Sequence, residues 1–121
     1  MAISEEYREY VRELFTGFGP VRLRSMFGAA GIFCDDLMIG LVIEEQIYLK
    51  VNDHNRADYE AAAQNPFIYE SKNGRTTTMS YYTIPDALYD DAEALAEWAG
   101  KAHAAALDWA KKKAPRRKRK K

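Results

Sequence analysis

Few side chains in this sequence of 121 residues have types and spacings that could support chemistry. His54 and Asp58 stand four apart in a segment expected to be helical, with Asp53 nearby, which could set two metal ligands on one helix face. No second group of ligands completes a coordination shell, so we expect solvated side chains there. Cys34 stands next to Asp35, and a neighbouring carboxylate raises the pKa of a thiol and blunts its reactivity.

The other candidate residues for chemistry also have ordinary structural interpretations. His103 falls in an alanine-rich segment, where we expect a surface or core-boundary position. The carboxylate pairs Asp35-Asp36, Glu44-Glu45 and Asp90-Asp91 fall at turns or a helix start, without an evident acid or base partner. The run 26–31 (MFGAAG) lacks the lysine and the glycine spacing of phosphate-binding loops. We therefore expect no catalytic residue, no cofactor and no metal.

The strongest physical feature is the separation of charge along the chain. Residues 111–121 hold nine of the 18 basic side chains and none of the 18 acidic ones, so residues 1–110 carry a net charge of −9. Such a tail attracts polyanions without regard to sequence, although it could also only aid solubility or fold back on the acidic body. The polyanion-binding candidates are Lys111, Lys112, Lys113, Arg116, Arg117, Lys118, Arg119, Lys120 and Lys121.

Length and composition place further bounds on the protein. The chain is long enough for one domain with its own core, which we place at residues 1–110, followed by a disordered basic tail at 111–121. Cys34 is the single cysteine, so no internal disulfide forms, which fits a reducing compartment. The acidic N-terminus does not resemble a signal peptide, and no apolar run approaches membrane-spanning length. We expect a cytoplasmic protein without a membrane partner.

The elements around these residues are clearest between residues 26 and 51. Three short apolar runs are separated only by Asp35-Asp36 and Glu44–Gln46, which is too little for helices. We therefore predict an antiparallel meander with strands at about Ala30–Cys34, Leu37–Ile43 and Gln46–Val51.

Caps and breakers define three helices in the rest of the chain. Ser4 can cap a first helix, and Asp53 can cap a second from about His54 to Gln64. Asp90 or Asp91 can cap a last helix, which we expect to run to about Lys113 before Pro115 ends the ordered chain.

A second hairpin completes the predicted sheet. Asn73-Gly74, a strong turn signal, separates Phe67–Lys72 from Arg75–Thr83. Residues 21–24 alternate apolar with basic side chains, as a short edge strand or an extended lead-in would. The order α-β(3)-α-β(2)-α predicts a two-layer α+β domain, an antiparallel sheet with helices packed on it. Both hairpin faces are partly apolar, so a homodimer that covers one of them is an alternative.

Several ordered words of the sequence resemble the TfoX N-terminal domain of the bacterial TfoX/Sxy family. Residues 24–33 (RSMFGAAGIF) are similar to its R-x-M-F-G-G-x-G opening, and matches continue in order to about residue 107. The matching residues, which we expect to be mainly structural, are Arg24, Met26, Phe27, Gly28, Gly31, Tyr48, Leu49, Lys50, Pro66, Phe67, Tyr69, Tyr81, Tyr82, Pro85 and Trp98.

The resemblance implies a fold shared in outline with secretion chaperones, and a relation to regulators of competence and gene expression. It supplies no catalytic residue. We therefore expect a non-enzymatic regulatory or adaptor domain that binds a protein partner and contacts nucleic acid unspecifically through its tail. The alternatives are a small-ligand or enzymatic pocket near Arg22, Arg24 and Tyr82, and a chaperone-like dimer.

Overall fold

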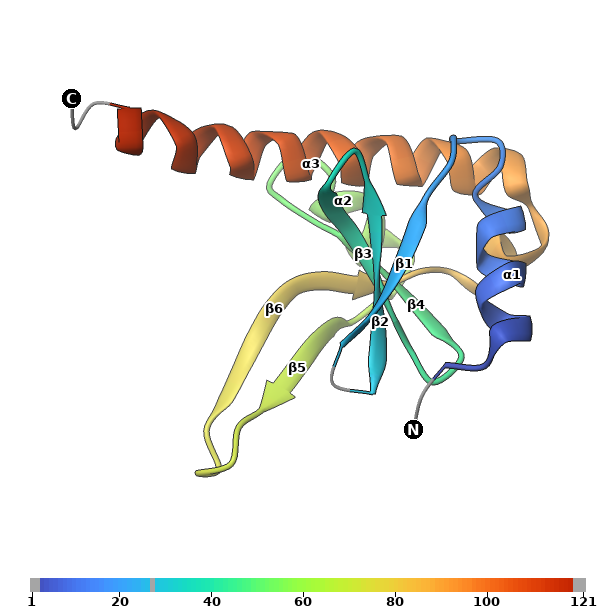
Figure 1. Cartoon of the computed structure of the whole chain (residues 1–121), viewed down its shortest axis with the longest axis horizontal. Helices are drawn as coiled ribbons and strands as arrows, with labels where there is room; N and C mark the ends of the chain where they lie inside the picture. The colour runs from blue at the N-terminus through green and yellow to red at the C-terminus, as the bar shows by residue number, and fades with distance from the viewer. Residues whose placement is uncertain (1–2, 27, 119–121) are drawn as a thin grey trace.

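Six antiparallel strands and three α-helices form the part of the chain that the computed structural model describes (Figure 1). It describes residues 3–26 and 28–118, of which 113–118 by their backbone only. The strand order is β1-β2-β3-β4-β6-β5. The elements are α1 (Glu5–Leu14), β1 (Arg22–Met26), β2 (Ala29–Cys34), β3 (Leu37–Ile43), β4 (Gln46–Lys50), α2 (Arg56–Ala61), β5 (Pro66–Glu70), β6 (Thr76–Thr83), the 3₁₀ turn η1 (Asp86–Asp90) and α3 (Ala92–Lys118).

The predicted meander is confirmed as β2, β3 and β4, each paired antiparallel with the next. Asp35 and Asp36 both have positive φ, 53° and 67°, as the central residues of a type I′ hairpin turn require. Gly28 carries the left-handed conformation before β2 (φ 79°), so Ala29 can begin the strand in an extended conformation. Turn residues therefore fix the register of this part of the sheet.

The sheet differs from the prediction at both of its edges. Residues 22–26 form a strand, β1, that pairs with β2 along its whole length. The alternation of apolar and basic residues at 21–24 is compatible with either an edge strand or an extended lead-in. At the other edge, the β5–β6 loop is longer than the two predicted turn residues. The Ser71 amide donates to the Arg75 carbonyl, and the amide of Gly74, whose φ is 82°, donates to the Ser71 carbonyl. The α+β, two-layer class is confirmed, with four strands before α2 instead of three.

All three helices contribute to one core on one face of the sheet. Val11 of α1, Phe15 at its C-terminal cap, Tyr59 of α2, and Leu95 and Ala99 of α3 are buried in this core. The small alanine side chains let α3 lie close to the sheet, and in Figure 1 this long helix crosses one end of the strands while the β5–β6 hairpin extends away. The sheet residues in this core include Ile32, Ile39, Val42, Ile47 and Leu49.

Helix boundaries follow the predictions in part. The Ser4 cap is confirmed, since its hydroxyl accepts a hydrogen bond from the Tyr7 amide at 3.1 Å. The predicted Asp53 cap is wrong: Asp53 pairs with Arg56 at 2.6 Å, and α2 spans only Arg56–Ala61. Helix α3 continues past the predicted end at Lys113 to Lys118. Pro115 removes one backbone donor there, but its lysine, arginine and alanine neighbours favour helix.

No helix in the described ranges is both long and apolar enough to cross a lipid bilayer.

Asn55 organises the loop that joins β4 to α2. It is 2% exposed, its side-chain carbonyl accepts a hydrogen bond from the Asn52 amide at 2.7 Å, and its amide donates to the Lys50 carbonyl at 3.1 Å. A buried amide that bonds the backbone in both directions stabilises one loop conformation. This loop borders the concave surfaces described below.

We expect Asn55→Leu to lower the free energy of unfolding by about 2–4 kcal/mol, because two backbone groups lose their partners in a buried place. Urea unfolding followed by circular dichroism measures this change. His54→Leu is the matched control, since its side chain lies on the exposed side of the same loop. Equal stability of the Asn55→Leu variant and the unchanged chain would contradict the assigned role.

Candidate functional site

The face of the sheet opposite the core carries a partly exposed aromatic surface. Residues alternate along β4, so Tyr48 and Lys50 lie on the face opposite the core while Ile47 and Leu49 enter the core. The Tyr48 ring meets the ring of Phe67 from β5 with 5.5 Å between centroids. This face thus offers apolar area that the described part of the chain covers only in part.

Gly31 makes room for two side chains on this face. A Cβ atom at this position would lie 2.8 Å from the Phe33 ring and 2.9 Å from the Met38 sulfur. The absence of a side chain lets Phe33 and Met38, which pair across β2 and β3, lie over the strand. The signature glycine at 31 therefore shapes a surface, in addition to any part it has in the backbone.

Lys50 stands at a hollow of about 300 Å³ between this face and α3. Its ammonium lies 5.0 Å from the centroid of the Tyr81 ring and 5.4 Å from that of Trp109, close enough for attraction to both ring faces. Partial burial lowers the pKa of Lys50. The apolar side chains that line the hollow, which we call the Lys50 hollow, are Phe33, Leu37, Met38, Tyr81, Ala106 and Trp109.

The acidic side chains near Lys50 pair with other residues: Asp53 and Asp108, which line a second hollow with Lys50, bond to Arg56 and Lys112. Within the described residues Lys50 forms no ion pair, and Asp36, the acidic residue of the lining, pairs with Arg22 at 2.9 Å. Trp109 is 52% exposed although it is a large aromatic side chain. A half-buried cation between two rings beside apolar walls can hold a ligand that presents both a carboxylate and an apolar group.

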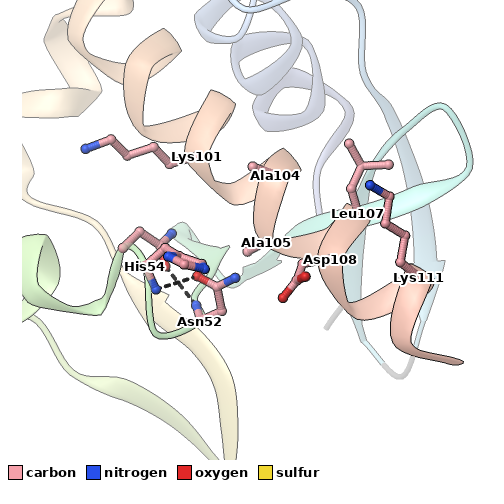
Figure 2. Close-up of a pocket in the computed structure, with 9 residues that line it drawn as sticks. Asn52, His54, Lys101, Ala104, Ala105, Leu107, Asp108 and Lys111 are labelled. Atoms are coloured by element: carbon pink, nitrogen blue, oxygen red, sulfur yellow. Dashed lines mark hydrogen bonds between the residues drawn. The ribbon is translucent and has the colours of Figure 1, made fainter.

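Two further hollows continue the Lys50 hollow along the C-terminal half of α3. A hollow of about 200 Å³ shares Lys50 and Trp109 with it, and one of about 450 Å³ lies beyond. Figure 2 shows the largest of the three, where Asn52 and His54 face the alanines of α3 across the opening. Two lining residues of this hollow form ion pairs with residues outside it, Asp108 with Lys112 at 3.5 Å and Lys101 with Asp58 at 2.9 Å.

The structure does not bring Arg22, Arg24 and Tyr82 together. The two arginines lie on β1, and three strands separate β1 from β6, which places Tyr82 roughly 19 Å away at the usual strand spacing. Arg24 instead stacks over the Phe33 ring at 5.4 Å, and Tyr82 packs against Tyr59 on the core side. The predicted pocket of these three residues is therefore wrong, because sequence periodicity does not give strand order.

His54 and Asp58 do not share a helix face, and His54 is exposed, as expected for a solvated side chain. His54 precedes the first residue of α2, and Asp58 is bonded to Lys101. A different group forms instead: the donor atoms of Cys34, Asp35 and His103 all lie within 4.8 Å of one another. Burial and the adjacent Asp35 raise the pKa of Cys34, in the predicted direction.

Most of the described signature residues have structural positions. Leu49 and Tyr81 are buried, Trp98 meets Tyr59 at 4.7 Å between ring centroids, and Pro85 precedes η1. Tyr69 is 52% exposed on the hairpin. Lys50 is the member that lines a hollow, while Phe27 lies outside the described residues.

The basic tail is described only in its first part. Lys111 and Lys112 are exposed on α3. The chain continues as helical backbone to Lys118, and Arg119, Lys120 and Lys121 lie outside the described residues. The role predicted for these cations stays a prediction.

Comparison with known proteins gives two matches. The model of the TfoX N-terminal domain family matches residues 13–106. Protein Sxy of Escherichia coli (strain K12) is 26% identical over 78 residues, which cover 64% of this chain. The matched part spans 37% of the length of that relative.

Proposed function

Because the chain belongs to the TfoX N-terminal domain family, a family of regulators, we propose that it is a non-enzymatic adaptor that binds a protein partner. The Lys50 hollow is the docking site in this proposal, and the basic tail adds unspecific attraction to nucleic acid. A cytoplasmic location and a role in competence or gene expression belong to the same proposal.

The observation that carries the proposal is that the Lys50 ammonium lies beside apolar side chains. The Lys50 ammonium has two aromatic neighbours and no ion pair among the described residues. An acidic residue two positions from an aromatic or aliphatic one, in an extended segment of a partner, fits this chemistry because both side chains then lie on the same face. The acidic side chain would reach Lys50 and the apolar one would enter beside Phe33 and Met38.

We expect Lys50→Met to weaken binding of such a segment by about 10- to 100-fold, the cost of one charge-assisted contact. The probe is a fluorescein-labelled peptide with aspartate and phenylalanine two positions apart, so that an extended chain presents both on one face, and fluorescence anisotropy measures its affinity. Methionine retains the length of the stem against the rings but removes the charge. Lys72→Met, at the exposed hairpin loop, is the matched control.

Equal affinity of the Lys50→Met and Lys72→Met variants would refute the Lys50 hollow as the docking site. A peptide with serine in place of phenylalanine tests the apolar half of the proposal and should bind more weakly.

A small carboxylate ligand is the second candidate, favoured by a hollow volume at the lower end of the range for small-molecule sites. Competition of the labelled peptide by phenylacetate distinguishes the two. Complete displacement at millimolar concentration favours the small ligand, whereas negligible displacement favours the peptide. Light scattering over a dilution series tests the remaining alternative, a chaperone-like dimer.

A further inference from the structure

Three side chains of different chemistry meet at the end of β2, outside the Lys50 hollow. Cys34 is the last residue of β2, Asp35 is the first residue of the following turn, and His103 comes from the middle of α3. One ligand atom from each lies within 4.8 Å of the others. Two elements that are far apart in the sequence thus bring a thiol, a carboxylate and an imidazole to one point.

We propose that Cys34, Asp35 and His103 form a binding site for Zn²⁺. Thiolate, imidazole and carboxylate are the ligand types that zinc uses in proteins, and a mixed set that contains a thiolate disfavours Mg²⁺ and Ca²⁺. Ligand atoms of a tetrahedral zinc lie about 3.3–3.7 Å apart, as its bond lengths require. The Cys34 Sγ and Asp35 Oδ2 atoms already lie 3.9 Å apart, so the largest approach that the group needs is about 1 Å.

The surroundings suit a site with one open position. Cys34 and His103 are half-buried, whereas Asp35 is exposed, so a metal can enter from the solvent side. The His103 ring lies edge-on to the Phe18 ring, with 6.0 Å between centroids, and this contact limits its rotation. Three protein ligands leave a fourth position for water or for a group from a partner.

Metal binding would attach the β2–β3 turn to α3. Asp35 is adjacent to Asp36, and Leu37 follows, so the same turn contributes to the Lys50 hollow. The proposed zinc site does not depend on the proposed partner, because its test measures the metal itself.

The test begins with metal-free protein, prepared by dialysis against a chelator. Titration with Zn²⁺ against a chromophoric chelator should show one site per chain. Co²⁺ in place of zinc should give the thiolate-to-cobalt charge-transfer absorption and the strong visible bands of a tetrahedral site. Cys34→Ser should abolish the charge-transfer band, and His103→Ala should lower zinc affinity by about 100-fold or more, beyond the cost of losing a supporting residue.

His54→Ala is the matched control, since the chain has two histidines and His54 lies at the exposed α2 loop. This variant should bind zinc as the unchanged chain does, and Asp35→Asn should weaken binding while the thiolate band persists. Circular dichroism confirms that each variant is folded. The proposal fails if the unchanged chain takes up no zinc at micromolar concentration. It also fails if folded Cys34→Ser and His103→Ala variants bind with undiminished affinity.

Discussion

Replacement of the nine basic side chains of residues 111–121 by glutamine is expected to remove most of the affinity of the protein for duplex DNA. Contact between about five of these cations and phosphates would give a slope of log affinity against log salt near −4 to −5. The affinity of the unchanged chain would then fall about 500-fold between about 50 and 200 mM salt. The glutamine variant should be weak at both concentrations and should show a slope near zero.

Fluorescence anisotropy with a labelled duplex of mixed sequence measures both slopes, and a second duplex of different sequence should bind equally well. Glutamine retains helix propensity, so the variant tests charge without disturbing the helical backbone that continues to Lys118. Lys72→Gln together with Lys101→Gln is a control that lowers charge elsewhere. DNA binding by the tail variant with an unchanged salt slope would assign the contact to the body of the domain.

Gly40→Ala is expected to lower the free energy of unfolding by about 3 kcal/mol, the upper part of the range for overpacked cores. A Cβ atom at this position would lie 2.5 Å from the Tyr48 carbonyl oxygen and 3.1 Å from the Leu49 side chain. The first of these neighbours is backbone in a paired strand, where Gly40 stands opposite Leu49, so it cannot move without loss of sheet hydrogen bonds. Urea unfolding measures the change.

Gly100→Ala is the matched control and should change stability in the opposite direction. Gly100 lies in α3 and is exposed, and a Cβ atom there meets nothing within 4 Å. Alanine in the interior of a helix stabilises by about 0.5–1 kcal/mol relative to glycine. Similar destabilisation by both substitutions would show that close approach in the sheet is not what Gly40 provides.

The sequence predicted the central strands well because local signals specify them. Short apolar runs with acidic turns leave only one arrangement for residues 29–50, and Ser4 and Asn73-Gly74 have strong positional preferences. The second helix was less accurate because Asp53 had two possible partners, the helix amides or Arg56, and the structure uses Arg56. Local patterns could not separate these two outcomes.

The candidate sites were less predictable because they depend on how distant elements pack. Lys50 meets Trp109 only after α3 crosses the end of β4, and Cys34 meets His103 by the same packing. Considered separately in the sequence, Cys34 indicated a thiol of low reactivity and His103 a surface or core-boundary residue. One signal for the Lys50 hollow was present, a lysine that follows the apolar run Ile47–Leu49, but its ring neighbours come from β6 and α3.

The Asp35-Asp36 turn has a thermodynamic consequence. Its two residues belong to neighbouring sites, Asp35 to the Cys34 group and Asp36 to the Lys50 hollow, and both hold left-handed backbone conformations. If occupation of one site shifts the turn, linkage requires that each ligand alter the affinity of the other by the same factor. Two adjacent peptide units would then make this hairpin a point of reciprocal control between metal and partner.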